Sequence, residues 1–270
     1  MDLVLHGVGK SFGGLRAVQD VSFTVRGGSI FGLIGPNGAG KTTVFNLVTG
    51  VYAPDAGTLR FGDIDLAPLS PARIAAAGIA RTFQNVRLFA QLTVLENLLV
   101  AREARERAGL FAALARTHAH ADFERAAQAR ATELLDVFGL TELAGAPATS
   151  LSYGHQRRLE IARAMMLEPK LLLLDEPAAG MSTAEADALT DRIRWLRDTF
   201  GVAVALVEHN MRVVMRVCEE IHVLDHGETI AHGTPDEVRV HPKVIGAYLG
   251  EDGTSPASPE RGPHQKEATA

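Results

Sequence analysis

The sequence predicts an α/β protein in which a mainly parallel core sheet carries an inserted α-helical lobe. Short apolar runs alternate with helical patterns over residues 29–83 and again over residues 171–224, which is typical of a parallel sheet covered by helices. Between these regions, residues 86–164 are rich in Ala, Glu, Arg and Leu, which favour helices. We therefore expect the helical lobe to occupy residues 86–164, inserted between two parts of the core.

Length and composition limit the architecture and the class of protein. A chain of 270 residues fits one α/β core with a smaller lobe, so residues 1–250 are predicted to form one domain. The single cysteine, Cys218, excludes an intramolecular disulfide and a cysteine-rich metal site. No apolar run approaches the roughly 20 residues that span a bilayer, and the N-terminus lacks a signal-peptide pattern. We therefore expect a soluble protein, and its net charge of −5 argues against non-specific binding to nucleic acid.

The individual elements follow from the apolar runs and the turn residues that flank them. Strands are predicted at 18–26, 29–34, 58–61, 79–83, 171–174, 202–207 and 221–224. Helices are predicted at 42–48, from Ser70 and Pro71 onward, at 183–199, and between the last two strands. Residues 109–121 are the least predictable part of the lobe. Residues 251–270 lack periodicity and are predicted to form a disordered tail.

A phosphate-binding motif follows the apolar strand 29–34. Residues 35–42, Gly-Pro-Asn-Gly-Ala-Gly-Lys-Thr, match the template G-x-x-x-x-G-K-[ST] between a strand and a helix. In such a loop the backbone N–H groups surround a phosphate, Lys41 reaches the terminal phosphates, and the Thr42 hydroxyl binds Mg²⁺. The alternative, a glycine-rich turn with a chance lysine, does not explain the strand and helix on either side. The predicted nucleotide-binding residues here are Gly35, Pro36, Asn37, Gly38, Ala39, Gly40, Lys41, Thr42 and Thr43.

Four polar residues follow other predicted strands, and the carboxyl ends of parallel strands meet at one edge of a sheet. Asp175 ends the run of leucines at 171–174 and is predicted to bind Mg²⁺ with Thr42 and Gln84. Glu176 comes next and can accept a proton from an attacking water, unless it is only a surface carboxylate. His209 is predicted to contact the γ-phosphate or the water, with a purely structural histidine as the alternative. Gln84 taken alone could be an ordinary loop residue.

A further segment carries a family resemblance. Residues 151–158, Leu-Ser-Tyr-Gly-His-Gln-Arg-Arg, precede Asp175 and resemble the LSGGQ signature of the ATP-binding-cassette (ABC) ATPases, with Leu151, Ser152 and Gly154 retained. An ordinary capped helix start would explain Ser152 alone. The resemblance implies a P-loop NTPase of the ABC ATPase fold, with an N-terminal antiparallel β subdomain, the parallel core and the helical lobe. It also implies that the chain hydrolyses ATP to drive a membrane transporter.

The resemblance further implies how the residues divide the work. Phe12 would stack on adenine, with a core phenylalanine in a hairpin as the alternative. The signature residues would cap an ATP held by a partner subunit, so that two ATP molecules join two subunits. Residues 179–182 match the family's D-loop in position but not in amino-acid sequence. Tyr153 and His155 replace the usual Gly and Gln of the signature, whose predicted contact residues are Ser152, Tyr153, Gly154, His155 and Gln156.

Several segments resemble one branch of the family. Residues 11–18, 81–84, 177–181 and 233–250 are similar to the larger ATPase of branched-chain amino acid importers of bacteria. This implies a second ABC ATPase as partner, two membrane permeases and an external substrate-binding protein. The two ATPases would form a heterodimer, with a homodimer as the alternative. It also places the chain on the cytoplasmic face of the inner membrane.

Other functions remain as alternatives. Related importers carry urea or short amides, and a related ATPase drives lipopolysaccharide export. A non-transport ABC protein would typically carry a coiled-coil insertion, a zinc module or a second cassette, none of which this sequence shows. A P-loop kinase would leave residues 151–158 unexplained.

Overall fold

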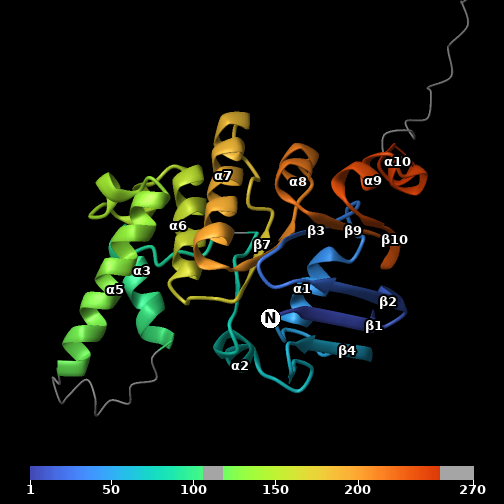
Figure 1. Cartoon of the computed structure of the whole chain (residues 1–270), viewed down its shortest axis with the longest axis horizontal. Coiled ribbons are helices and arrows are strands. Elements are labelled where there is room, and N and C mark those ends of the chain that lie inside the picture. The colour runs from blue at the N-terminus through green and yellow to red at the C-terminus, as the bar shows by residue number, and fades with distance from the viewer. Residues whose placement is uncertain (85, 106–117, 250–270) are drawn as a thin grey trace, which may run out of the picture.

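The computed structural model describes residues 1–84, 86–105 and 118–249, and it builds this part of the chain from two sheets and several helices (Figure 1). A six-stranded sheet has the order β10-β9-β3-β8-β7-β6, and a four-stranded sheet has the order β2-β1-β4-β5. In the larger sheet, β3, β6, β7, β8 and β9 run parallel, and β10 pairs antiparallel with β9. The predicted fold class is therefore confirmed.

The described strands are β1 (Leu3–Phe12), β2 (Leu15–Val25), β3 (Ile30–Ile34), β4 (Ala56–Phe61), β5 (Ile64–Asp65), β6 (Ile79–Arg81), β7 (Leu171–Asp175), β8 (Ala203–Val207), β9 (Glu220–Asp225) and β10 (Glu228–Gly233). The described helices are α1 (Lys41–Val48), α2 (Pro71–Ala76), α3 (Val94–Arg105), α5 (His118–Val137), α6 (Tyr153–Met165), α7 (Thr183–Phe200), α8 (Met211–Val217), α9 (Pro235–Arg239) and α10 (Pro242–Leu249). Within these ranges, no helix is long and apolar enough to cross a membrane.

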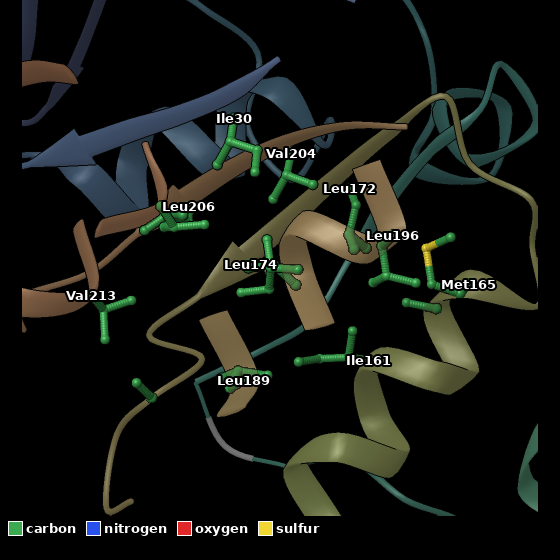
Figure 2. Packing of buried hydrophobic residues seen from close by; sticks show 14 of the residues in the cluster. Ile30, Ile161, Met165, Leu172, Leu174, Leu189, Leu196, Val204, Leu206 and Val213 are labelled. Carbon is green, nitrogen blue, oxygen red and sulfur yellow. The ribbon is translucent and has the colours of Figure 1, made fainter. Parts of the chain in front are cut away.

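The central strands bury side chains on both faces of the larger sheet. Leu172 and Leu174 of β7 pack with residues of α6 and α7 in one buried cluster (Figure 2). Leu171 and Leu173 of the same strand belong to a second cluster with α1 and the antiparallel sheet. Parallel strands covered on both faces have continuous apolar sequences because neither side of the pleat meets water. The four consecutive leucines thus reflect two cores, one on each face.

The antiparallel sheet contains a strand that the apolar pattern does not reveal. β1 pairs with β2 on one side and β4 on the other, but its register shifts between Leu5 and Val8. Gly7 lies in this irregular stretch with a φ of 60°, and the strict alternation of buried residues is lost there. An extra residue in one strand breaks the period of two by which strands are recognised.

Three elements near the end of the described chain, β10, α9 and α10, were also not predicted from the sequence pattern.

The helical lobe shares its core with the larger sheet. Val94 of α3, Leu134 of α5 and Leu159 of α6 are fully buried and belong to the same cluster as Leu172 and Leu174. Figure 1 shows α3, α5 and α6 together on one side of the molecule, beside α7. Most of residues 109–121, and all of the predicted tail 251–270, lie outside the described residues.

Several predicted strand ends differ from those in the structure, and two of the differences have a visible cause. β2 begins at Leu15 rather than residue 18, because Leu15 already pairs with Phe12 across the turn. β6 ends at Arg81 rather than Phe83. The Thr82 N–H still donates to the Leu173 carbonyl at 2.9 Å, but the Phe83 N–H turns to the Glu160 carboxylate at 3.4 Å. The chain thus leaves the sheet at Phe83 and enters the lobe.

Candidate functional site

The loop after β3 has a backbone that requires glycine. Gly35 and Gly40 have φ values of 148° and 101°. A Cβ atom at Gly35 would lie 2.0 Å from the Leu224 carbonyl oxygen, and one at Gly40 would lie 2.4 Å from the Ala17 carbonyl oxygen. The loop curls around the Lys41 ammonium group, which donates to the carbonyls of Gly35 at 2.6 Å and Pro36 at 2.7 Å. The structure therefore forms a backbone cradle with a positive charge inside it.

Helix α1 opens directly from this cradle. Its N-cap is Gly40, and among the described residues no side chain caps its first N–H groups or adds an acidic charge to its first turn. Such a helix start attracts anions through its N–H groups and its dipole. Thr42 is exposed and Thr43 half-buried in this turn. The cradle and α1 together fit the phosphates of a nucleotide.

The carboxyl ends of β6, β7 and β8 bring three of the predicted residues together. Gln84 Nε2 donates to Glu176 Oε2 at 3.1 Å, and His209 Nδ1 lies 3.8 Å from the same oxygen. The Glu176 side chain is 21% exposed, so water can reach it. Glu176 has a φ of 47°, which a residue with a side chain adopts at a free-energy cost of roughly 1–3 kcal/mol. A partly exposed carboxylate between an amide and an imidazole is suited to accept a proton from water.

Asp175 has a partner that the sequence analysis missed. Its carboxylate is buried and pairs with the Arg81 guanidinium at 2.8 Å, and Arg81 also donates to Asn46 Oδ1 at 2.7 Å. Arg81 ends β6, the strand next to β7, so the strand-end rule that selected Gln84 could also have selected Arg81.

The oxygen donors fit a hard divalent cation. Thr42, Gln84 and Asp175 offer a hydroxyl, an amide and a carboxylate oxygen, which are ligands that Mg²⁺ accepts along with water and phosphate. Within the described ranges, no group of three or more His, Cys, Asp or Glu residues could hold a metal ion by itself. Any Mg²⁺ here would thus depend on few protein ligands, as is usual where phosphates supply the others.

Glu208 organises the loop that carries His209. The Glu208 side chain is fully buried and accepts from three backbone N–H groups: Ala178 at 2.8 Å, His209 at 3.0 Å and Asn210 at 3.0 Å. A buried carboxylate is stable when backbone donors satisfy it. The sequence pattern offered no signal for this role. Glu208 therefore joins the loop after β7 to the loop after β8.

The predicted signature residues form the exposed start of α6. Ser152 caps the helix, and its Oγ lies 3.0 Å from His155 Nδ1. Gln156 Nε2 donates to the Leu151 carbonyl at 3.0 Å, and Tyr153 lies against Gly180. Partial burial lowers the pKa of His155, the positive charge of Arg158 adds to this, and the Glu185 carboxylate opposes it. Ser152 is thus the N-cap of α6, and its contact with a nucleotide stays a prediction.

Phe12 is not a core residue. It is 41% exposed at the turn between β1 and β2, so the alternative of a core phenylalanine in a hairpin is wrong. The Phe12 ring meets the Tyr52 ring edge-on at 5.0 Å between centroids, and the Lys10 ammonium lies 5.6 Å from its centre. An exposed aromatic surface of this kind can take a stacked base, and stacking on adenine stays a prediction.

Comparisons with known proteins agree with this geometry. The chain matches the ABC transporter family over residues 18–179 and the branched-chain amino acid ATP-binding cassette transporter family over residues 228–254. It is 47% identical, over 249 residues, to the high-affinity branched-chain amino acid transport ATP-binding protein LivG of Salmonella typhimurium, covering 92% of this chain and 98% of the relative. It is 46% identical over the same length to BraF of Pseudomonas aeruginosa, and 38% identical over 250 residues to the lipopolysaccharide export system ATP-binding protein LptB of Escherichia coli, covering 93% and 98% of the two chains.

The fold has also been seen in crystals. The ADP conformation of MJ1267, an ATP-binding cassette of an ABC transporter, superposes with a TM-score of 0.79 at 31% identity, covering 93% of this chain and 99% of that one. Fold and site together define a nucleotide-binding ATPase of the cassette class. The chain belongs to the ABC transporter family, and within it the chain is LivG-like. It is an ATPase whose hydrolysis of ATP is coupled to transport. The resemblance stated from the sequence is confirmed, and the roles of single site residues stay predictions.

Proposed function

We propose that this chain lies on the cytoplasmic face of the inner membrane and powers the import of branched-chain amino acids into the cell. The observation that carries the proposal is the 47% identity to LivG over 98% of that relative's length, compared with 38% to LptB. The match of residues 228–254 to the branched-chain amino acid transporter family supports it independently. These residues include β10, α9 and α10 and contain none of the predicted site residues.

The partners in this proposal are a second ABC ATPase, two membrane permeases and, indirectly, an external substrate-binding protein. No nucleic acid is expected. The support from the fold is that α6 and α1 pack into clusters on opposite faces of the larger sheet. This arrangement supports a contact of Ser152 and Gly154, at the start of α6, with the nucleotide of a second subunit rather than that of their own. A heterodimer follows from the importer type, and a homodimer uses the same contact.

In the proposed reaction, Glu176 accepts a proton from the water that attacks the γ-phosphate. Gln84, 3.1 Å from the Glu176 carboxylate, and His209, 3.8 Å from it, orient that water and the carboxylate. Lys41 neutralises phosphate charge inside the loop formed by residues 35–40. Mg²⁺, held by Thr42, Gln84 and Asp175, supplies charge neutralisation on the phosphates when it is bound. The residues of the chain therefore place the reactants and take up one proton.

Two other substrates remain as candidates for a specific reason. The 38% identity to LptB over 98% of its length keeps lipopolysaccharide export open. Urea or short amides remain because importers of the same type carry them, and the substrate contacts lie on other chains. Both alternatives predict the same ATPase chemistry and differ only in what is transported.

The test is transport by the complete complex. The chain would be reconstituted in proteoliposomes with the ATPase and permeases that co-purify with it and with their external binding protein. We expect leucine, isoleucine or valine to stimulate ATP turnover and to accumulate on the cytoplasmic side. Glu176→Gln in the same complex is the control for transport without hydrolysis. Stimulation by urea or acetamide alone, or extraction of lipopolysaccharide, would replace the proposed substrate.

A further inference from the structure

An arginine on α6 is fully buried and turned toward the catalytic strand end. The Arg157 side chain is 0% exposed. It donates to the backbone carbonyls of Asp175, Glu176 and Phe83, with 2.8 Å to the Glu176 oxygen. A buried guanidinium is stable only when its donors and its charge are satisfied. Arg157 meets that need largely with the carbonyls of two loops that leave the sheet.

Glu160, one turn further along α6, completes the arrangement. Its carboxylate is 1% exposed and pairs with the Arg157 guanidinium at 2.8 Å. The other carboxylate oxygen accepts from the backbone N–H groups of Phe83 at 3.4 Å and Arg87 at 3.3 Å. The two side chains therefore hold the segment that carries Gln84 as well as the strand end that carries Glu176.

These contacts act on a strained backbone. Glu176 has a φ of 47°, and such a conformation persists only where the surroundings hold it. Its N–H donates to the Val207 carbonyl at 2.8 Å, and its carbonyl accepts from Arg157 at the same distance. If the bond from Arg157 were lost, the peptide could relax and carry the Glu176 carboxylate away from Gln84.

We propose that Arg157 and Glu160 are positioning residues for ATP hydrolysis, an inference that rests on the proposed role of Glu176 as the general base. The pair holds Glu176 and Gln84 in contact and joins both to α6. The same helix begins with residues 153–156, which are proposed to meet the nucleotide of the partner subunit. Movement of α6 when the subunits close would thus be transmitted to the catalytic carboxylate through two side chains.

The test separates positioning from folding. Arg157→Met combined with Glu160→Leu removes both charges, so no lone buried charge is left to unfold the chain. The control is Arg130→Met with Glu133→Leu, because Arg130 and Glu133 form a pair with the same spacing and distance, 2.8 Å, on α5. This pair is more exposed than Arg157 and Glu160, so it controls for the loss of a helical ion pair rather than for burial. In the reconstituted complex, we expect turnover to fall by about 10–100-fold in the first variant, the usual effect of misplacing a reacting group. Nucleotide affinity should stay within about threefold, and the control should keep normal turnover.

Two further variants make the result decisive. Arg157→Lys keeps the charge beside Glu160, but one ammonium nitrogen cannot serve the three carbonyls and the Glu160 carboxylate as the planar guanidinium does. Its turnover should therefore lie between that of the wild type and that of the double variant. In a Glu176→Gln background, the Arg157→Met and Glu160→Leu pair should cause no further loss in a single-turnover assay, because residues that act as a unit are not additive.

Three outcomes would overturn the proposal. These are normal turnover in the double variant, equal losses of turnover and nucleotide affinity, and a full additional loss in the Glu176→Gln background. Near-normal turnover in Glu176→Gln alone would instead show that Glu176 is not the general base, and the proposed positioning role would fall with that assignment. The failure of the proposed chemistry is thereby distinguished from a failure of the positioning role alone.

Discussion

At the scale of single residues, the site depends on three charged side chains that are held by different partners. Lys41 is 9% exposed, and its ammonium group is held by carbonyls of its own loop. Asp175 is buried and paired with Arg81. Glu176, the neighbour of Asp175, is the more exposed of the two carboxylates, and among the described residues its carboxylate forms no ion pair with an arginine. The two adjacent carboxylates are therefore suited to different tasks.

We predict that Lys41→Ala nearly abolishes ATP binding. The lysine neutralises phosphate charge that the N–H groups of the loop and α1 cannot neutralise alone. Titration of the purified variant with a fluorescent ATP analogue measures the effect. Thr43→Ser, which keeps the hydroxyl in the first turn of α1, serves as the control for a general disturbance of the helix. Unchanged affinity in Lys41→Ala would remove the phosphate-loop assignment.

We predict different consequences for the two carboxylates. Glu176→Gln keeps the shape of the side chain but cannot take a proton, so turnover should drop by about 10²–10⁴-fold while ATP binding survives. The ATP-bound dimer should then accumulate in size-exclusion chromatography. Asp175→Asn should weaken Mg²⁺-dependent binding itself, and should also lower thermal stability because Arg81 loses its buried partner. Normal turnover in Glu176→Gln would shift the role of base to His209 or to a shared network.

At the scale of elements, the carboxyl ends of β6, β7 and β8 contribute the polar groups of the site, and packing behind the sheet holds them in place. β9 illustrates how tightly that packing excludes charge. His222 on β9 is 1% exposed, lies 4.9 Å from the Phe23 ring centroid, and bonds Thr229 Oγ1 at 2.8 Å. Burial lowers the pKa of His222 to about 4, and the neighbouring His232 adds to the shift.

This shift predicts a loss of stability in mild acid. An unfolded histidine takes up its proton near pH 6.5, whereas folded His222 resists protonation until about pH 4. The free energy of unfolding should therefore be fully retained above pH 6.5 and fall as the pH drops toward 4, by about 2 kcal/mol between pH 7.5 and 5.0. Urea unfolding of the wild type and of His222→Phe at both pH values measures this difference. The exposed His226→Phe is the control, and an equal pH dependence in His222→Phe would contradict the prediction.

At the scale of the whole molecule, the lobe and the larger sheet share one buried cluster, while α1 and the antiparallel sheet share the other. Figure 1 shows α6 beside α7, and β1, β2 and β4 gathered on the other side of the molecule. Helix α6 and helix α1, which opens from the phosphate loop, therefore pack into different clusters on opposite faces of the larger sheet. Two such chains placed head to tail would bring one α6 to the other's loop.

We accordingly predict that the isolated chain is a poor ATPase. Its specific activity should rise with protein concentration or when the partner ATPase and permeases are added, because Ser152 and Gly154 are proposed to complete a site on another subunit. Steady-state hydrolysis measured from nanomolar to micromolar protein, with and without the partners, tests this. Full activity that stays strictly proportional to protein at nanomolar concentration would contradict a shared site.

The sequence by itself determined the family, the fold class and most of the polar residues at the strand ends. It could do so because these features are local: a loop that needs glycine at 35 and 40, apolar runs buried on both faces, and a polar residue where each run stops. Only the tertiary structure decided how those residues are held. The Arg81–Asp175 ion pair, the bond from Arg157 to the Glu176 carbonyl and the backbone contacts of Glu208 join segments that are far apart in the chain. These segments meet only when the strands pair and α6 packs against the sheet. β1 was missed for a related reason, because its irregular register is maintained by strands on both sides rather than by its own alternation.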